Sequence, residues 1–267
     1  SDHNYLPYSV GLLQTYYEAN GLNKKKYQFI DHIYKRDNVE KLSQKLSSNN
    51  IVAFSTYIWN INISIAIAKR VKELNPKVFI VFGGPQVPDR TEPFLRTNRF
   101  IDIACNGEGE QTFTDILNAY PNIDYRKIES ISYIEDDVYL QTKRRDRIRD
   151  IGTIPSPYLS GTFDKIMADN SKEHWLFLME TNRGCPFSCT FCDWGSAVAA
   201  KVSQFPLQRV LDEIEWIANK KIEFVFCCDA NFGMLSRDLE IVKHVVKINK
   251  ATGFPEALSV QNTKNST

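Results

Sequence analysis

The chain has 267 residues, of which 43% are hydrophobic and 24% charged, and its formal net charge is +1. This length and this balance are enough for a substantial core and for two domains. The near-neutral charge gives no sign of a nucleic-acid-binding surface. The longest apolar runs, such as residues 78–82, have the length of a strand and are too short to cross a membrane.

Six cysteines occur without the even, regular spacing of a disulfide framework. We therefore expect free thiols in a reducing compartment, and with no recognisable signal peptide or membrane span we expect a cytoplasmic protein. The sequence opens without a strand pattern and closes on the polar stretch 261–267 directly after one. It reads as a piece of a longer protein.

Helical and strand patterns alternate in the first part of the chain. Hydrophobic spacing predicts helices at residues 6–20, 39–46, 61–74, 92–96 and 111–120, and strands at 27–34, 51–57, 77–82 and 100–105. This alternation predicts an α/β domain with a flavodoxin-like, doubly wound parallel sheet, which we place at residues 1–125.

Ligands of such sheets bind at the carboxyl ends of the strands. Three loops follow predicted strands there, and their candidate residues are Ser55, Thr56, Gly83, Gly84, Gly107 and Glu108. Glycines after strands also simply make tight turns, so a purely structural role for the Gly83–Gly84 pair stays open.

A connection follows at residues 126–172. Residues 131–134 and 138–141 predict a β-hairpin with a polar turn, and the mixed charges of 143–150 predict a solvated linker. The prolines of residues 154–158 hold the next stretch extended.

Residues 173–267 again alternate strands and helices. Strands are predicted at 175–180, 222–228 and 258–261, with helices at 207–220 and 239–250. We interpret this region as the first half of a TIM-type barrel, whose active sites form at the carboxyl ends of the strands. Cys227 and Cys228 point to opposite faces of a strand and are expected in the core and barrel lining.

Cys185, Cys189 and Cys192 form a CxxxCxxC array directly after the predicted strand 175–180. Gly184 and Pro186 indicate a loop that can wrap around a metal centre, so the pattern favours an iron–sulfur cluster with one iron left open. Two alternatives stay open: a zinc site, or three small side chains packed on one face of a helix.

This array, with Phe191 before its last cysteine, resembles the radical S-adenosylmethionine (SAM) superfamily. The resemblance implies a [4Fe-4S] cluster on Cys185, Cys189 and Cys192 that chelates SAM and cleaves it reductively to a 5'-deoxyadenosyl radical. It also implies a reducing partner such as flavodoxin or ferredoxin. The predicted SAM-contacting residues are Glu180, Phe191, Asp229, Asn231 and Gln261. A turn or capping role for Asp229 and an internal Glu180–Arg183 ion pair are open alternatives.

The serine loop, the Gly-Gly loop and the turn at residues 106–110 are similar to cobalamin-binding domains that precede a radical SAM barrel. The resemblance implies cobalamin contacts from the six loop residues named above. The sequence departs from the family because it has no DxHxxG motif, and His32 is interpreted as structural. On this resemblance, the chain lacks the first amino-terminal strand and the second half of the barrel.

Taken with the cysteine array, the resemblance implies cobalamin-dependent methyl transfer to an unactivated carbon or phosphorus of a small-molecule or natural-product-like substrate. One alternative is a radical SAM enzyme of a non-methylating type without a bound corrinoid. The other is an iron–sulfur or zinc binding module with no activity in this form.

Overall fold

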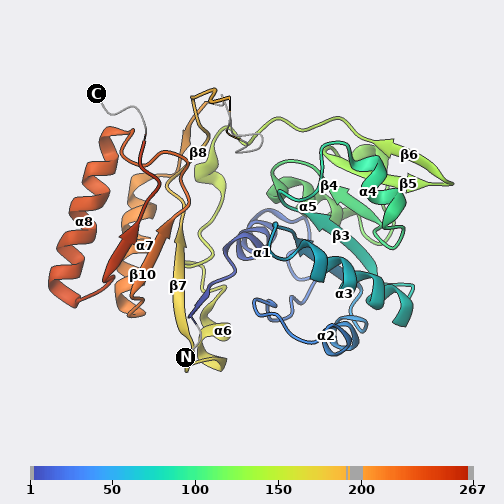
Figure 1. Ribbon diagram of the computed structural model, residues 1–267, viewed down its shortest axis with the longest axis horizontal. Helices are drawn as coiled ribbons and strands as arrows, with labels where there is room; N and C mark the ends of the chain where they lie inside the picture. The colour runs from blue at the N-terminus through green and yellow to red at the C-terminus, as the bar shows by residue number, and fades with distance from the viewer. Residues whose placement is uncertain (1–2, 191, 193–200, 264–267) are drawn as a thin grey trace. The chain divides into compact units, whose positions relative to one another are not determined.

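The computed structural model describes residues 3–190, 192 and 201–263, and its chain forms two compact units (Figure 1). We call residues 16–27 and 35–148 the five-stranded unit, and residues 1–15, 28–34 and 149–267 the cysteine unit. The predicted domain boundaries lie at residues 125 and 172. Each unit contains segments from both sides of at least one of these boundaries. The two are described one at a time.

The five-stranded unit is built on one sheet with the order β2-β3-β4-β5-β6. Strands β2 (Ile51–Ser55), β3 (Phe79–Gly83) and β4 (Ile103–Cys105) are parallel. The hairpin of β5 (Ile131–Glu135) and β6 (Val138–Gln141) is antiparallel and pairs with β4. The hairpin predicted for the connection therefore extends this sheet.

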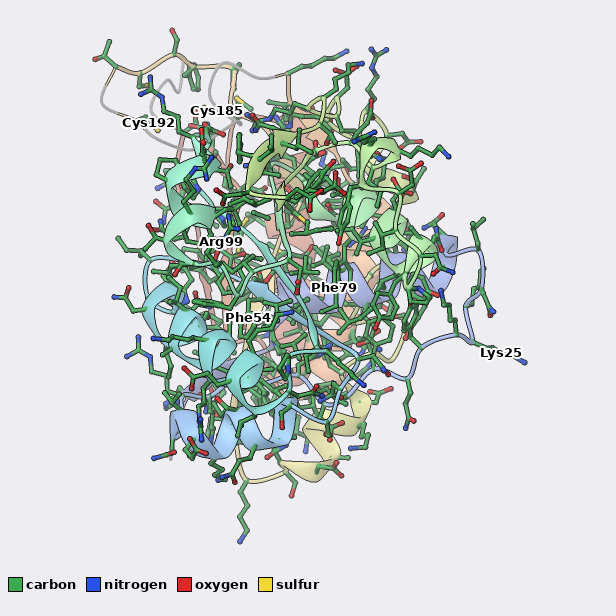
Figure 2. The ribbon with its side chains drawn as sticks, turned by 90° about the vertical axis from the view of Figure 1, so that its right-hand side faces the viewer. Lys25, Phe54, Phe79, Arg99, Cys185 and Cys192 are labelled. Atoms are coloured by element: carbon green, nitrogen blue, oxygen red, sulfur yellow. The ribbon has the colours of Figure 1, made fainter. Side chains whose placement is uncertain are left out.

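Helices cover both faces of the sheet, so its central strands are apolar on both sides. Along β3, Ile80 and Phe82 pack into a cluster with α2 (Val39–Leu46), α3 (Ile61–Leu74) and α4 (Thr91–Thr97). Phe79 and Val81 belong to a second cluster with α5 (Gly109–Ala119). Phe54 and Phe79, labelled in Figure 2, belong to these two different clusters. The predicted α/β class with a parallel sheet is confirmed.

The strand predicted at residues 27–34 is wrong, since none of these residues lies in a strand. Its alternating pattern comes from side chains that anchor an irregular segment. Tyr27 donates its hydroxyl to the Leu117 carbonyl at 2.7 Å, and the Tyr34 ring lies 4.9 Å from that of Trp175. His32 is mostly buried beside Gln14, and this burial lowers the pKa of its imidazole, in line with a structural role.

A parallel sheet with the order β1-β7-β10-β11 forms the cysteine unit. The strands are β1 (His3–Tyr5), β7 (His174–Met179), β10 (Phe224–Cys227) and β11 (Ala257–Ser259). Helices α7 (Leu207–Asn219) and α8 (Ser236–Thr252) contact each other beside it (Figure 1). This strand–helix alternation agrees with the predicted βα units, and the half barrel stays a prediction.

The expectation that the chain opens without a strand is wrong, because β1 pairs with β7 in register. Three residues are too few to show a two-residue hydrophobic period. Four further helices belong to the described structure: α1 (Tyr8–Asn20), α6 (Asp164–Asp169), and the 3₁₀ helices η1 (Tyr125–Lys127) and η2 (Ile151–Thr153). In the described part of the chain, every helix is too short or too polar to span a bilayer.

Candidate cofactor sites

The cysteine loop, residues 184–202, starts just beyond the carboxyl end of β7. It leaves through β8 (Asn182–Arg183) and returns through β9 (Ser203–Gln204), and these two short strands pair antiparallel at its base. Gly184 stands at this base with φ 109°, and a Cβ there would lie 2.6 Å from the Lys201 carbonyl oxygen. Glycine is therefore required by both conformation and space.

The three loop cysteines are free thiols, with Cys185 buried and Cys189 and Cys192 half-buried (Figure 2). They lie on irregular backbone, where the Cys192 amide donates to the Cys189 carbonyl at 3.1 Å. The alternative of a shared helix face is therefore wrong for these residues. Three thiols from one loop suit an iron–sulfur cluster, in which each thiolate binds a different iron.

Asn231 lies beside the first cysteine, and its predicted contact with SAM stays a prediction. Asn231 is buried in the loop after β10 and its side-chain amide donates to the Cys185 sulfur at 3.1 Å. Hydrogen bonds to cysteine sulfurs help set the reduction potential of iron–sulfur clusters. The structure thus gives Asn231 a position from which it can tune a metal centre.

Asp229 holds the end of β7 against the β8–β9 ladder. One carboxylate oxygen accepts the amides of Thr181 at 2.8 Å and Asn182 at 3.2 Å. The other accepts the Asn182 side-chain amide at 2.8 Å and the Thr181 hydroxyl. Burial raises the pKa of Asp229 to about 6 despite these hydrogen bonds. Its carboxylate is thus engaged inside the protein, and its SAM contact stays a prediction.

Glu180 forms the ion pair that was the alternative to a ligand contact. Arg183 donates to both of its carboxylate oxygens, at 2.9 and 3.2 Å, and the Tyr8 hydroxyl donates to it at 3.2 Å. Arg237 also supports this region by donating to the Thr181 carbonyl at 2.9 Å. Tyr8 and Arg237 were missed because no local pattern connects positions so far apart in sequence.

Two predicted SAM-contacting residues remain, Gln261 and Phe191. Gln261 has an exposed side chain, and its backbone carbonyl accepts the Phe232 amide at 2.7 Å. Phe191 lies outside the described residues.

The other three cysteines lie outside the cysteine loop. Burial raises the pKa of Cys105 and Cys228 to about 12 and also raises that of Cys227. Burial thus favours the protonated thiol at these positions. The core role predicted for Cys227 agrees with its complete burial.

In the five-stranded unit, Thr56 joins the loops that follow β2 and β3. Its backbone amide and its hydroxyl both donate to the Gly83 carbonyl, each at 2.7 Å. Gly84 has φ 97°, and a Cβ there would lie 2.6 Å from the Thr56 carbonyl oxygen. Around Gly83 there is more room, since its nearest neighbour would be the Cys105 Cβ at 3.7 Å. Ser55, at the end of β2, is half-buried.

The turn after β4 is also held by its own side chains. Asn106 is buried, donates to the Thr91 hydroxyl at 3.1 Å and accepts the Ser132 hydroxyl at 3.0 Å. Glu108 accepts the Ile148 amide at 2.7 Å. A Cβ at Gly107 would meet its nearest atom, on Arg144, at 3.7 Å, which is an ordinary contact distance.

An exposed apolar patch directly follows Thr56. Tyr57 and Trp59 stack with ring centroids 4.7 Å apart, and Ile58 and Trp59 are 76% and 63% exposed. Exposed apolar patches often mark binding surfaces. Sequence reasoning missed this one because Tyr57 was taken as the end of the strand; two aromatic residues just past a ligand-binding strand end were the available signal.

Comparisons with known proteins show which proteins this chain resembles. The B12 binding domain model matches residues 13–117. The fold matches the cobalamin-dependent SAM radical enzyme OxsB, solved with aqua-cobalamin and SAM bound, with a TM-score of 0.71 and 18% identity over 92% of this chain and 34% of that one. The resemblance to the cobalamin-binding subclass of radical SAM proteins is confirmed.

Individual relatives match along nearly the whole chain. The 2-(S-pantetheinyl)-carbapenam-3-carboxylate methyltransferase of Streptantibioticus cattleyicolor is 36% identical, over 98% of this chain and 39% of its own length. The cobalamin-dependent radical SAM methyltransferase TokK of Streptomyces tokunonensis is 37% identical, over 100% of this chain and 40% of its own length. The chain thus spans about two fifths of the length of these relatives.

Proposed function

We propose that the protein to which this chain belongs is a cobalamin-dependent radical SAM methyltransferase. The observation that carries the proposal is the three-cysteine loop, closed at its base by the β8–β9 ladder, in a chain that also matches the B12 binding domain. Both relatives described above are named as methyltransferases, which favours methyl transfer over the non-methylating alternative.

The donor set of the cysteine loop fits a [4Fe-4S] cluster. Cys185, Cys189 and Cys192 would hold three irons and leave the fourth without a protein ligand. When bound, the reduced cluster supplies the electron that cleaves SAM. The Asn231 amide donates toward the first ligand, and Asp229 keeps the strand end beneath the loop in place. These residues order the cluster site before any ligand arrives.

The loops of the five-stranded unit fit a large flat ligand. At Gly83 and Gly107 a Cβ would meet its nearest neighbour at 3.7 Å, an ordinary contact distance, and without a Cβ a ligand can approach the backbone more closely there. Ile58 and Trp59 offer exposed apolar surface two and three residues after Thr56. Ser55, Thr56, Gly84 and Glu108 would complete the cobalamin-contacting loops. Cobalamin, when bound, supplies the methyl carrier.

For the substrate, we propose a small, natural-product-like molecule with an unactivated acceptor carbon or phosphorus. The support is the name of one relative, a 2-(S-pantetheinyl)-carbapenam-3-carboxylate methyltransferase. A flavodoxin or ferredoxin would supply electrons, and the free thiols suit the reducing cytoplasm.

Isotope transfer in the full-length protein tests this function. After anaerobic loading with iron, sulfide and hydroxocobalamin, the protein is incubated with a chemical reductant and SAM that carries a deuterated methyl group. We expect deuterated methylcobalamin on the protein, together with 5'-deoxyadenosine that is lost in the triple variant Cys185→Ala/Cys189→Ala/Cys192→Ala. Two results would contradict the proposal. One is cobalamin without a deuterated methyl group, and the other is equal formation of 5'-deoxyadenosine by the triple variant and the wild type.

A further inference from the structure

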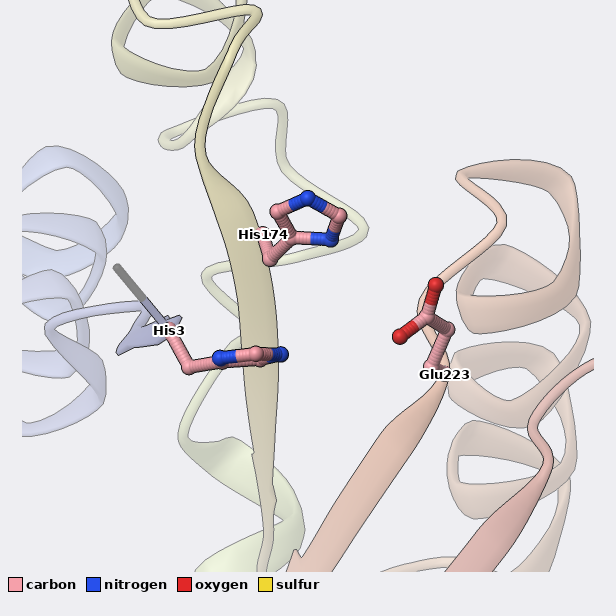
Figure 3. Close-up of side chains that lie close together, drawn as sticks. All are labelled: His3, His174 and Glu223. Carbon is pink, nitrogen blue, oxygen red and sulfur yellow. The ribbon is translucent and has the colours of Figure 1, made fainter. Parts of the chain in front are cut away.

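A second group of metal-ligating side chains lies at the other end of the parallel sheet of the cysteine unit. His3 begins β1, His174 begins β7, and Glu223 directly precedes β10. One ligand atom from each lies within 4.8 Å of the other two, and all three residues are exposed. Figure 3 shows the two imidazoles and the carboxylate gathered in the same space from three neighbouring strands.

The backbone holds these three positions together. His3 and His174 are direct partners in the β1–β7 ladder, and their ring centroids are 5.3 Å apart. β7 pairs in turn with β10, and the Glu223 carbonyl accepts the amides of Glu256 at 2.7 Å and Ala257 at 3.0 Å. Only side-chain rotations are therefore needed to bring the three ligand atoms onto one ion.

Side-chain rotation is enough to close the remaining distance. Zinc bonds to imidazole nitrogen and carboxylate oxygen are about 2.0–2.2 Å long, so tetrahedral ligand atoms stand roughly 3.4 Å apart. Exposed side chains reach such positions by moving between staggered rotamers, with no change in the sheet.

We propose that His3, His174 and Glu223 form a Zn²⁺ site. Two imidazoles and one carboxylate are a ligand set that zinc prefers, and they leave a fourth position for water. The site is separate from the cysteine loop. His174 is the first residue of β7 and the loop lies beyond its last, a separation of about 20 Å for a six-residue strand.

Bound zinc would fasten β1 to the sheet. β1 has three residues and is the first strand in the order β1-β7-β10-β11, so among the described strands only β7 pairs with it. The ion binds the folded arrangement and not the unfolded chain, so it stabilises the cysteine unit by mass action. The site thus has a structural role that is independent of the proposed reaction.

Calorimetric titration of the chelator-treated chain with Zn²⁺ tests the site. Free thiols such as those of the cysteine loop can also take up zinc, so the decisive quantity is the difference between the wild type and His174→Ala. We expect the wild type to bind one more zinc ion per chain. Loss of a direct ligand should weaken this site by more than about tenfold, since even indirect partners of metal ligands contribute that much. His3→Ala and Glu223→Ala should behave like His174→Ala.

His244→Ala is the matched control. His244 lies on α8 of the same unit, and its Nε2 atom is 3.5 Å from a carboxylate oxygen of Glu215 on α7. The His244→Ala variant should keep the full zinc stoichiometry. Cobalt separates the two sites, since only the thiolates give sulfur-to-cobalt charge-transfer absorption and His174→Ala should leave that absorption unchanged. Equal zinc stoichiometry and affinity in the wild type and His174→Ala would overturn the proposal, as would the same zinc loss in His244→Ala.

Discussion

The two candidate cofactor sites hold their loops by different means. The base of the cysteine loop depends on a buried carboxylate, since Asp229 receives four donors from Thr181 and Asn182. The loops after β2 and β3 of the five-stranded unit depend on an uncharged residue, since Thr56 donates twice to the Gly83 carbonyl. Stability should therefore respond to pH through Asp229 and not through Thr56.

The two sites also share one structural feature. Each has a glycine at positive φ pressed against a backbone carbonyl, Gly184 against Lys201 and Gly84 against Thr56. In both sites, polar residues predicted as ligand contacts are engaged in ordering the loops. The two sites differ in the side chains that they offer to a ligand. The cysteine loop offers thiols, and the other site offers exposed apolar side chains.

The largest expected effect comes from adding a methyl group at the two glycines that lie against a backbone carbonyl. Gly184→Ala and Gly84→Ala should each lower the free energy of unfolding by about 3 kcal/mol, because left-handed backbone strain and overpacking add. Gly233 and Gly107 are matched controls with positive φ and no close neighbour, so their alanine variants should lose only about 1 kcal/mol. Urea unfolding measures all four, and equal losses in variant and control would refute the close-contact argument.

The next largest expected effect is the pH dependence of stability at Asp229. Burial raises the pKa of Asp229 to about 6, above the value near 3.9 of an unfolded chain. The folded state therefore favours the protonated carboxyl, and this contribution is full below about pH 4 and lost as pH rises through 6. Wild type should lose about 2 kcal/mol over this range relative to Asp229→Asn.

Urea unfolding at several pH values checks this prediction, with Thr56→Val as the comparison from the five-stranded unit. Thr56→Val should differ from wild type by a constant amount, about 1 kcal/mol for one hydrogen bond. A constant difference for Asp229→Asn as well would show that the carboxyl has no raised pKa.

Removal of exposed apolar surface tests the five-stranded unit as a binding site. Trp59→Ala should weaken hydroxocobalamin binding about tenfold, equivalent to about 1.4 kcal/mol, because the indole would be covered on binding. Val138→Ala is the control, since Val138 is 56% exposed on the hairpin of the same unit. Equilibrium dialysis gives both dissociation constants, and no difference between the two variants would remove the patch from the proposed site.

The smallest expected effect concerns the tuning of the cluster. Asn231→Leu removes an N–H donor from the Cys185 sulfur, and such donors stabilise the more negative, reduced state. The midpoint potential should fall on the order of tens of millivolts. Gln261→Leu changes an exposed amide on the same unit and should leave it unchanged. Anaerobic titration followed by electron paramagnetic resonance measures both, and an unaltered potential in Asn231→Leu would contradict this role.

Sequence predicted the regular elements well where periodicity was long. The helices at 39–46 and 61–74 begin and end at the predicted residues. It failed where short segments depend on distant partners, as in β1, the β8–β9 ladder and the irregular segment 27–34. A two- or three-residue strand carries no period of its own.

The cysteine loop itself was recognisable, because its ligands lie close together in sequence. The contacts that order it were not, since Asp229 is 48 residues from Thr181 and Tyr8 is 172 from Glu180. Residue type indicated that polar groups gather near the strand ends. Which atom each one contacts depends on the folded arrangement of β7 and β10.

Metal content after anaerobic loading tests the central claim most directly. The full-length protein is given iron, sulfide and hydroxocobalamin, desalted, and assayed for iron and cobalt. We predict about four iron atoms and about one cobalt atom per chain. Cys185→Ala/Cys189→Ala/Cys192→Ala should lose the iron and keep the cobalt, and Cys105→Ala/Cys228→Ala should keep both. Wild type without cobalt, or the triple variant with its iron intact, would contradict the account.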